Sequence, residues 1–175
     1  MFAPLNPVTG EGSVGERSPV YISDFAIPKQ WLPRDMLHIP FVQKLAKAGS
    51  IESFIINVLH DEASEANHLA VSRTLIRLRF KHDFAFWAAT LVKIKNKQAG
   101  EDVLFRLYYP QRILVSRFEE CRRNGKPIRL ILLKARQWGG STTTQLYMAW
   151  LQFFHRKGLN SLIIAHQGTA CLLYT

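Results

Sequence analysis

The final part of the chain lacks acid: no aspartate or glutamate follows Glu120 among the 175 residues. Cysteine is scarce, and because Cys121 and Cys171 show neither metal-ligand spacing nor a disulfide framework, we expect reduced thiols. No apolar run approaches the roughly 20 residues that a membrane-spanning helix needs. Residues 1–19 lack the charged and then apolar pattern of a signal peptide. These absences predict a cytoplasmic chain with no membrane partner.

The charge that is present is unevenly distributed. Residues 1–72 carry 5 basic and 8 acidic side chains, for a net charge of −3, whereas residues 73–175 carry 18 and 5, for a net charge of +13. A basic second part suits a polyanionic partner such as DNA, RNA or the phosphates of a nucleotide. A solvated basic face accounts for the charge equally well.

Composition and pattern divide the chain into three expected regions. Residues 1–30 are expected to be a flexible lead-in, because their first part is rich in proline, glycine and serine. Residues 31–82 are expected to be mainly helical, and residues 83–175 to form an α/β domain that begins with a β-hairpin.

Local signals place the helices of the second region. A helix is expected from residue 34 to residue 48, ending at Gly49. Asp61 or Ser64 can cap the next helix. Residues 74–81 also alternate between apolar and basic side chains as a strand would, but the length of the pattern favours a helix. The side chains that this helix is expected to turn toward a core are Leu69, Leu75, Ile76 and Phe80.

The third region begins with aromatic side chains and a predicted hairpin. Phe84, Phe86 and Trp87 are spaced for packing in a core rather than for stacking on nucleic-acid bases. Residues 90–97 and 103–107 read as two strands joined by a loop that contains glycine.

A strand–helix–strand pattern comes next. Pro110 opens an expected helix over residues 111–123. Residues 128–133 are apolar without alternation, as in a strand buried on both faces of a parallel sheet. An apolar helix over residues 145–155 and a second such strand over residues 161–165 complete a right-handed βαβ unit. The predicted fold class is therefore α/β, with an incomplete parallel βαβ core of the kind found in P-loop NTPases.

Residues 134–142, between the first of these strands and the helix, read Lys-Ala-Arg-Gln-Trp-Gly-Gly-Ser-Thr. A glycine-rich turn between a strand and a helix presents backbone N–H groups, and the helix N-terminus adds partial positive charge. A hydroxyl at the helix start, from Ser141 or Thr142, could reach Mg²⁺. The stretch therefore predicts a phosphate-binding loop.

The standard phosphate loop, G-x-x-x-x-G-K-[ST], is matched only in part. With Ser141 at the last position, Gly139 takes the place of the second glycine. Gly140 falls where the lysine belongs, and Lys134 falls where the first glycine belongs. The cation that the phosphates need can instead come from Lys134 or Arg136.

This displaced-lysine loop resembles that of the large terminase subunits of tailed bacteriophages, which are ATP-driven DNA-packaging motors with a deviant Walker A motif. Residues 133–142 carry the resemblance, which extends over residues 83–169. It identifies residues 83–175 as a truncated P-loop ATPase domain. It also implies ATP and Mg²⁺ as cofactors and double-stranded DNA, a small terminase subunit and a portal protein as partners. The implied location is the cytoplasm of a bacterial host, for a phage or prophage product.

The resemblance also implies a role for single residues. Gln111 would read the adenine edge, and Lys134 would contact the β- and γ-phosphates. Ser141 would be the ligand of Mg²⁺, and Arg136 would be the catalytic residue that stabilises charge on the transferred phosphoryl group. The nucleotide-binding residues implied are Gln111, Lys134, Ala135, Arg136, Gln137, Trp138, Gly139, Gly140, Ser141 and Thr142.

The chain departs from that family after the loop. A large terminase has a pair of carboxylates on a later strand, a coupling motif and a nuclease domain with acidic metal ligands, and no acidic residue follows Glu120 here. The expectation is a truncated, frame-shifted or fragmentary N-terminal part that binds ATP without hydrolysing it unaided. Two alternatives stay open. In one, the chain is a basic nucleic-acid-binding module in which residues 134–142 are only a tight turn. In the other, it is an inactive remnant.

Overall fold

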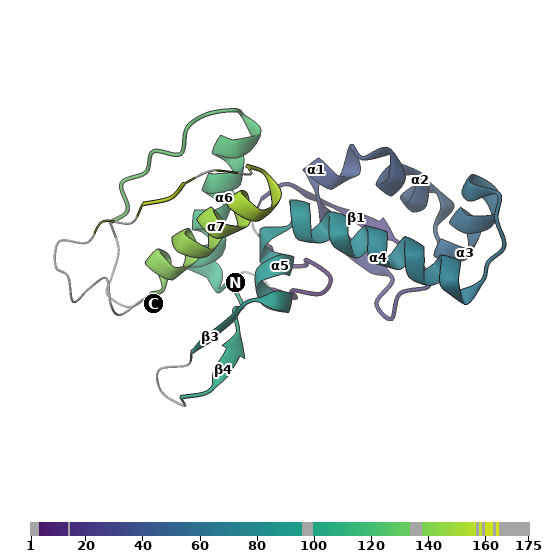
Figure 1. The fold of residues 1–175 in the computed structure, drawn as a ribbon, viewed down its shortest axis with the longest axis horizontal. Helices are drawn as coiled ribbons and strands as arrows, with labels where there is room; N and C mark the ends of the chain where they lie inside the picture. Colours follow the sequence, from purple (N-terminus) through teal and green to yellow (C-terminus); the bar gives the residue numbers. More distant parts are fainter. Residues whose placement is uncertain are drawn as a thin grey trace.

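The computed structural model describes residues 4–13, 15–95, 100–133, 138–156, 158, 160–162 and 164. Within them the fold mixes helices with two small antiparallel sheets, and helices predominate (Figure 1). None of the helices in this part of the chain is long and apolar enough to cross a membrane. The elements are β1 (Arg17–Tyr21), β2 (Lys29–Pro33), α1 (Arg34–Leu37), α2 (Pro40–Ala48), α3 (Ile51–Phe54), the π-helix η1 (Ile55–Leu59), α4 (Glu65–His82), α5 (Phe84–Leu91), β3 (Lys93–Lys95), β4 (Asp102–Leu104), α6 (Tyr109–Arg123) and α7 (Gly140–Phe154).

Strand β1 and the start of β2 lie within residues 1–30, the expected lead-in. Strand β1 pairs antiparallel with β2, with Ser18 opposite Leu32. Val20 and Leu32 are buried in a first core that the two strands share with α1 to α4. This first core includes residues on both sides of residue 30. The division of the chain into three regions stays a prediction.

Helix ends in the first core follow their local signals. Gly49 ends α2 with a left-handed φ of 76°, as predicted. The hydroxyl of Ser64 accepts the Asn67 N–H at 3.3 Å and caps α4, also as predicted. The single helix expected over residues 34–48 is divided into α1 and α2, because Pro40 occupies the first turn of a helix, where a missing N–H costs nothing.

Residues 74–81 are helical rather than extended, as their length indicated. The buried face of α4 runs through Val71, Leu75 and Arg79, which are four residues apart. Leu75 was expected in the core and is there. Leu69 and Ile76 were expected there too, and this was wrong: they are 47% and 43% exposed because they lie off that face.

A second core forms around aromatic side chains. Phe84 and Trp87 are buried, which confirms their predicted packing role. Trp150 of α7 is fully buried beside them, with its ring centroid 5.7 Å from that of Phe84. Phe86 is half-buried and stacks on Phe80 at 5.4 Å. The buried residues of this core are Phe84, Ala85, Trp87, Ala88, Phe105, Leu107, Leu114, Val115, Phe118, Tyr147 and Trp150.

The predicted hairpin is confirmed in a shorter form. Strands β3 and β4 pair antiparallel, with Ile94 opposite Val103. Thr90 was expected to begin the first strand, but it lies in α5, where its hydroxyl donates to the Phe86 carbonyl at 2.6 Å. Residues 96–99 lie outside the described residues.

A buried charge network joins the two cores. Asp83 ends α4 and begins α5, and Arg17 of β1 donates to both of its carboxylate oxygens at 2.7 and 2.8 Å. Arg79 contacts the same carboxylate at 3.5 Å and donates to the side-chain oxygen of Gln30 at 2.9 Å. The Phe86 N–H donates to Asp83 at 3.2 Å and so caps α5. One carboxylate therefore ties β1 and β2 to the α4–α5 junction.

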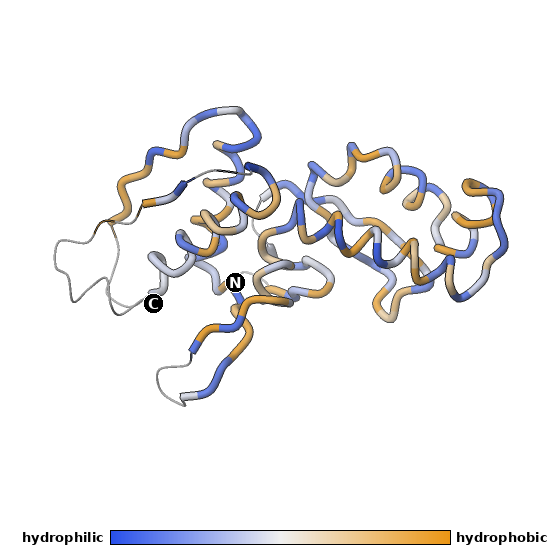
Figure 2. The backbone as a smooth tube through the Cα atoms, viewed as in Figure 1, coloured by the Kyte–Doolittle hydropathy of each residue, from blue (hydrophilic) through white to orange (hydrophobic). Residues whose placement is uncertain are grey.

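The two expected parallel strands are not formed by the residues that the structure describes. Ile131 and Leu133 are fully exposed, and Leu162 and Ile164 are 79% and 83% exposed. No strand is assigned to either segment, and both described sheets are antiparallel. A strand buried on both faces needs a neighbour on each edge, and among the described residues neither segment is paired with one. Figure 2 shows the resulting run of apolar residues in the segment after α6.

Candidate nucleotide-binding site

The predicted phosphate loop falls partly within the described residues. Residues 138–142 are described, and they form the start of α7. The predicted roles of the earlier loop residues therefore stay predictions. The loop residues that lie outside the described part of the chain are Lys134, Ala135, Arg136 and Gln137.

The N-terminus of α7 is open. Gly139 occupies the cap position with a left-handed φ of 73°, and no side chain caps the helix. The backbone N–H groups of Gly140, Ser141 and Thr142 have no acceptor within the described residues. Three adjacent donors at the positive end of a 15-residue helix form a favourable environment for an anion.

Hydroxyl groups at the start of α7 divide into two kinds. Thr143 and Thr144 donate back to the carbonyl oxygens of Gly139 and Gly140, each at 2.9 Å. Ser141 is exposed, and its hydroxyl makes no hydrogen bond to any described residue. The hydroxyl of Thr142 makes none either, so Ser141 and Thr142 are the two hydroxyls at the start of α7 without a partner among the described residues, and Ser141 is the more exposed.

Gln111, the predicted adenine-reading residue, lies against the loop. Its side-chain oxygen accepts the Tyr108 N–H at 3.2 Å, and its amide nitrogen donates to the Trp138 carbonyl at 3.4 Å. The Tyr108 hydroxyl donates to the same carbonyl. Two predicted site residues, Gln111 and Trp138, are thus brought together. The Gln111 amide is buried and engaged, so its observed contacts hold the loop in position.

Sequence reasoning gave no role to Tyr108. Its hydroxyl reaches the loop across 30 residues of sequence, and no motif marks a tyrosine for that contact. The one signal available for this contact was the position of Tyr108, which directly precedes the Tyr109-Pro110 start of α6 and lies near the predicted Gln111.

Close packing explains the pair of glycines in the loop. A Cβ atom on Gly139 would lie 2.6 Å from the Gln111 amide nitrogen. A Cβ atom on Gly140 would lie 2.5 Å from the indole ring of Trp138. Both distances are shorter than ordinary van der Waals contact, so the loop accommodates side chains at neither position without rearrangement.

Replacing Gly139 with alanine is expected to destabilise the protein by more than the cost of the left-handed backbone alone. That cost is about 1–2 kcal/mol, and displacement of the Gln111 amide adds to it. Gly125→Ala is the matched control, since Gly125 has a φ of 63° and nothing within 4 Å of its Cβ position. Urea unfolding of both variants checks the difference. Equal losses would show that Gln111 does not hold the loop.

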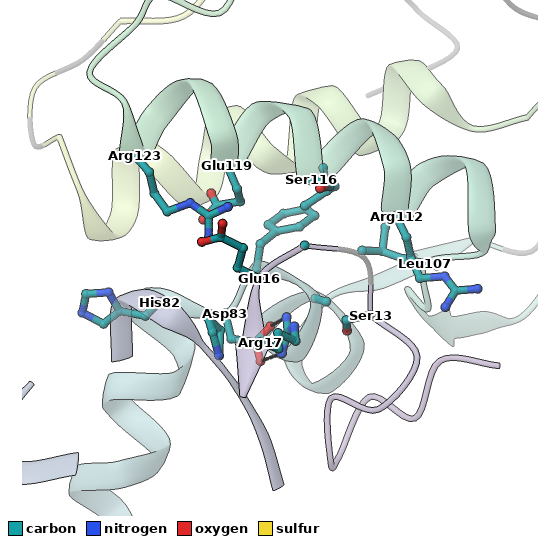
Figure 3. A pocket seen from close by; sticks show the side chains of 15 residues that line it. Ser13, Glu16, Arg17, His82, Asp83, Leu107, Arg112, Ser116, Glu119 and Arg123 are labelled. Carbon is teal, nitrogen blue, oxygen red and sulfur yellow. Dashed lines mark hydrogen bonds and ion pairs between the residues drawn. The ribbon is translucent and has the colours of Figure 1, made fainter. Parts of the chain in front are cut away.

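A second polar cluster surrounds a cavity of about 40 Å³ between the N-terminal segment, the start of α5 and α6 (Figure 3). The cavity has room for a few water molecules and not for a nucleotide. Figure 3 shows the Arg17–Asp83 ion pair among the side chains that line it. The cluster therefore belongs to the joint between the two cores. Its polar lining residues are Ser13, Glu16, Arg17, His82, Asp83, Arg112, Ser116, Glu119 and Arg123.

The far end of α7 is fixed to α4. The indole N–H of Trp150 donates to the Phe80 carbonyl at 2.7 Å, and Nε2 of His155 contacts the Lys81 carbonyl at 2.8 Å. The rings of His82 and His155 meet edge to face at 6.1 Å. Burial is the main cause that lowers the pKa of both histidines. Both rings are therefore neutral at physiological pH, which keeps this contact free of like-charge repulsion.

Within the part of the chain that the structure describes, no three His, Cys, Asp or Glu side chains come together as a metal site.

Comparisons of the chain with protein-family models, with curated proteins and with solved structures found no match.

Proposed function

We propose that this chain binds the phosphates of ATP through residues 134–142 and corresponds to the N-terminal part of a DNA-packaging ATPase of the large terminase type. The observation that supports this most directly is the open N-terminus of α7, with three N–H donors that lack an acceptor among the described residues. An anion seated there meets the positive end of the helix dipole. Lys134 supplies the cation that the loop lacks at Gly140.

The remaining roles follow from this placement of the phosphates. Ser141 holds Mg²⁺, and Arg136 stabilises charge on the γ-phosphate. Gln111 lies beside the loop and is the adenine-reading residue of the proposal. To read the base, its amide must exchange its contact with the Trp138 carbonyl for one with adenine. Tyr108, whose hydroxyl shares that carbonyl, would hold the loop during the exchange.

The proposal includes a parallel βαβ core. The apolar segments before and after α7 would become its two strands when further strands cover them. The exposure of both segments supports this part of the proposal. The apolar side chains of residues 130–133, Leu162 and Ile164 lie in water, and strands added on either side would bury them. Double-stranded DNA, a small terminase subunit, a portal protein and the cytoplasm of a bacterial host follow from the resemblance alone.

Nucleotide binding is the direct test. ATP with Mg²⁺ is expected to bind the wild-type chain, and Lys134→Ala is expected to weaken binding about tenfold or more, because a charged hydrogen bond is worth about 1.5–3 kcal/mol. Lys44→Ala, which removes an exposed charge from α2, is the control. Isothermal titration of each variant with ATP and ADP measures the effect. Absence of binding at millimolar nucleotide, or equal binding by Lys134→Ala, would contradict the proposal.

The same preparation tests hydrolysis. We expect no ATP turnover above background, because no acidic residue follows Glu120 to orient the attacking water. Turnover that depends on Lys134 would show that a carboxylate earlier in the chain serves instead.

A nucleic-acid-binding module is the second candidate function. The observation that favours it lies on α4, where Arg73, Arg77 and Lys81 are exposed at successive four-residue intervals on one face. Such a stripe suits a phosphate backbone. Binding of short duplex DNA with a steep salt dependence, unchanged in Lys134→Ala but weakened in Arg73→Ala, would favour this candidate over the ATP site.

A further inference from the structure

A groove of about 440 Å³ lies at the C-terminal ends of α6 and α7. It is therefore at the end of α7 away from the open N-terminus. It is separate from the phosphate loop and shares no residue with it. Its lining residues are Arg122, Gly125, Lys126, Pro127, Ile128, Leu151, His155 and Arg156.

The rim of this groove is positively charged. None of its lining residues is acidic. Arg122 is already engaged, since it contacts Asp35 at 2.5 Å and Glu119 at 2.7 Å. Lys126 and Arg156 are exposed, and neither forms an ion pair with any described residue. Two positive charges among the lining residues are therefore left to a ligand.

The floor of the groove is apolar. Leu151 is half-buried, and Ile128 is 37% exposed. Pro127 also lines the groove, and it has no backbone N–H to offer a ligand. A ligand that fits needs an apolar group as well as negative charge.

The apolar residues of the groove distinguish between two kinds of polyanion. The carbonyl oxygens of Glu120, Cys121 and Arg122 at the end of α6 already accept N–H groups of residues 124–126, so the contacts left to a ligand are those of side chains. A phosphate backbone could pair with the two basic side chains but offers nothing to Leu151 and Ile128. A peptide offers carboxylates to the basic side chains and apolar side chains to Leu151 and Ile128.

We propose that this groove docks a short acidic segment of a partner protein. An apolar side chain of that segment packs on Leu151 and Ile128, and flanking carboxylates pair with Lys126 and Arg156. This inference goes beyond the proposed nucleotide site and does not depend on it. It concerns the described arrangement, in which Ile128 is exposed and no further strand covers the segment that it begins.

The test uses a fluorescein-labelled synthetic peptide of alternating leucine and glutamate pairs, followed by fluorescence anisotropy. We expect the wild-type chain to bind it, and the double variant Lys126→Glu/Arg156→Glu to bind about tenfold more weakly, a change of about 1.4 kcal/mol. Ile128→Ser is expected to weaken binding without any change of charge. The controls are Lys44→Glu, which reverses an exposed charge on α2, and a peptide with lysine in place of glutamate.

Three outcomes overturn the proposal. The first is no binding of the acidic peptide to the wild-type chain. The second is equal binding by the double variant, which would place the peptide elsewhere. The third is binding of short duplex DNA, and not of the peptide, with loss in the double variant, which would make the groove a phosphate site. Circular dichroism of each variant confirms that the helices are retained.

Discussion

Replacing Asp83 with asparagine is expected to lower the free energy of unfolding by about 3–5 kcal/mol, the cost of breaking a buried ion pair by removing one partner. The side chain of Asp83 is 1% exposed, and those of Arg17 and Arg79 are 12% and 7% exposed. Loss of the negative charge leaves two guanidinium groups close together in the interior. One of them, Arg79, already has a buried nitrogen with no hydrogen-bond partner.

The geometry makes this carboxylate hard to replace. Both oxygens accept hydrogen bonds from Arg17, and the backbone N–H of Phe86 and the side chain of Arg79 complete the set. An amide has one acceptor oxygen and would direct N–H donors at a donor. Helix α5 would also lose the charged form of its cap.

Urea unfolding of Asp83→Asn against the wild type measures the loss. The matched control is Glu120→Gln, which breaks the exposed pair that Glu120 forms with Arg117 at 2.7 Å. An exposed pair is worth about 0–1 kcal/mol. Similar losses in the two variants would show that the buried network does not stabilise the joint between the cores.

Acid unfolding provides a second test of the network around Asp83. Burial alone would raise the pKa of Asp83, but Arg17 and Arg79 hold it below the usual value. A carboxyl with a lower pKa in the folded state stabilises the protein above its unfolded pKa, and this contribution is lost as the pH falls through the folded pKa. Below about pH 4, the wild-type chain should therefore lose stability more steeply than Asp83→Asn.

The features that sequence predicted best are those decided within one turn of the chain. Gly49 ends α2 and Ser64 caps α4 through contacts to residues three or four positions away. Pro110 lies in the first turn of α6 for an equally local reason. Such signals do not depend on where the rest of the chain packs, so they can be read from single residues.

Contacts between distant residues could not be predicted in this way. Asp83 meets Arg17 across 66 residues, and nothing near either side chain in sequence marks the pair. The apolar run at residues 128–133 was predicted to be a buried strand, but a strand is defined by its neighbours, and apolar composition cannot supply them. Leu69 and Ile76 were misplaced because helical periodicity alone does not decide which face meets a core.

The candidate site combines both kinds of information. The glycine turn and the helix after it are local, and α7 begins at Gly140, close to where the motif predicted. The resemblance gave Gln111 the role of reading adenine, and its contact with the loop, which joins residues 27 apart, was not predicted. The observed hydrogen bonds of the Gln111 side chain are to Tyr108 and to the loop backbone, a structural role that the motif did not indicate.

Replacing Trp150 with alanine is expected to lower the free energy of unfolding by about 3–5 kcal/mol, as large aromatic deletions in cores do. Trp150 is fully buried, and its indole N–H donates to the Phe80 carbonyl at 2.7 Å. Its ring also meets that of His155 at 4.6 Å and that of Tyr147 at 5.5 Å. The variant leaves a cavity and an unpaired carbonyl at the point where α7 is fixed to α4.

Phe153→Ala is the matched control, because Phe153 lies on the same helix and is 69% exposed, so its truncation should change stability by less than about 0.5 kcal/mol. Trp150→Phe separates the loss of packing from the loss of the hydrogen bond. It keeps an aromatic ring but cannot donate to the Phe80 carbonyl, at an expected cost of about 1–3 kcal/mol. Urea unfolding ranks the three variants. A loss in Trp150→Ala no greater than in Phe153→Ala would contradict the packing described for the second core.

Trp150→Ala also tests how the loop depends on the helix behind it. Because α7 carries the open N–H groups at its first turn, loosening its far end should weaken ATP binding together with stability. Lys134→Ala should weaken ATP binding and leave the unfolding midpoint unchanged, since a loop cation contributes little to the core. Titration and unfolding of both variants therefore separate two contributions to the proposed nucleotide site: the charge proposed to contact phosphate and the packing that holds the N–H donors in place.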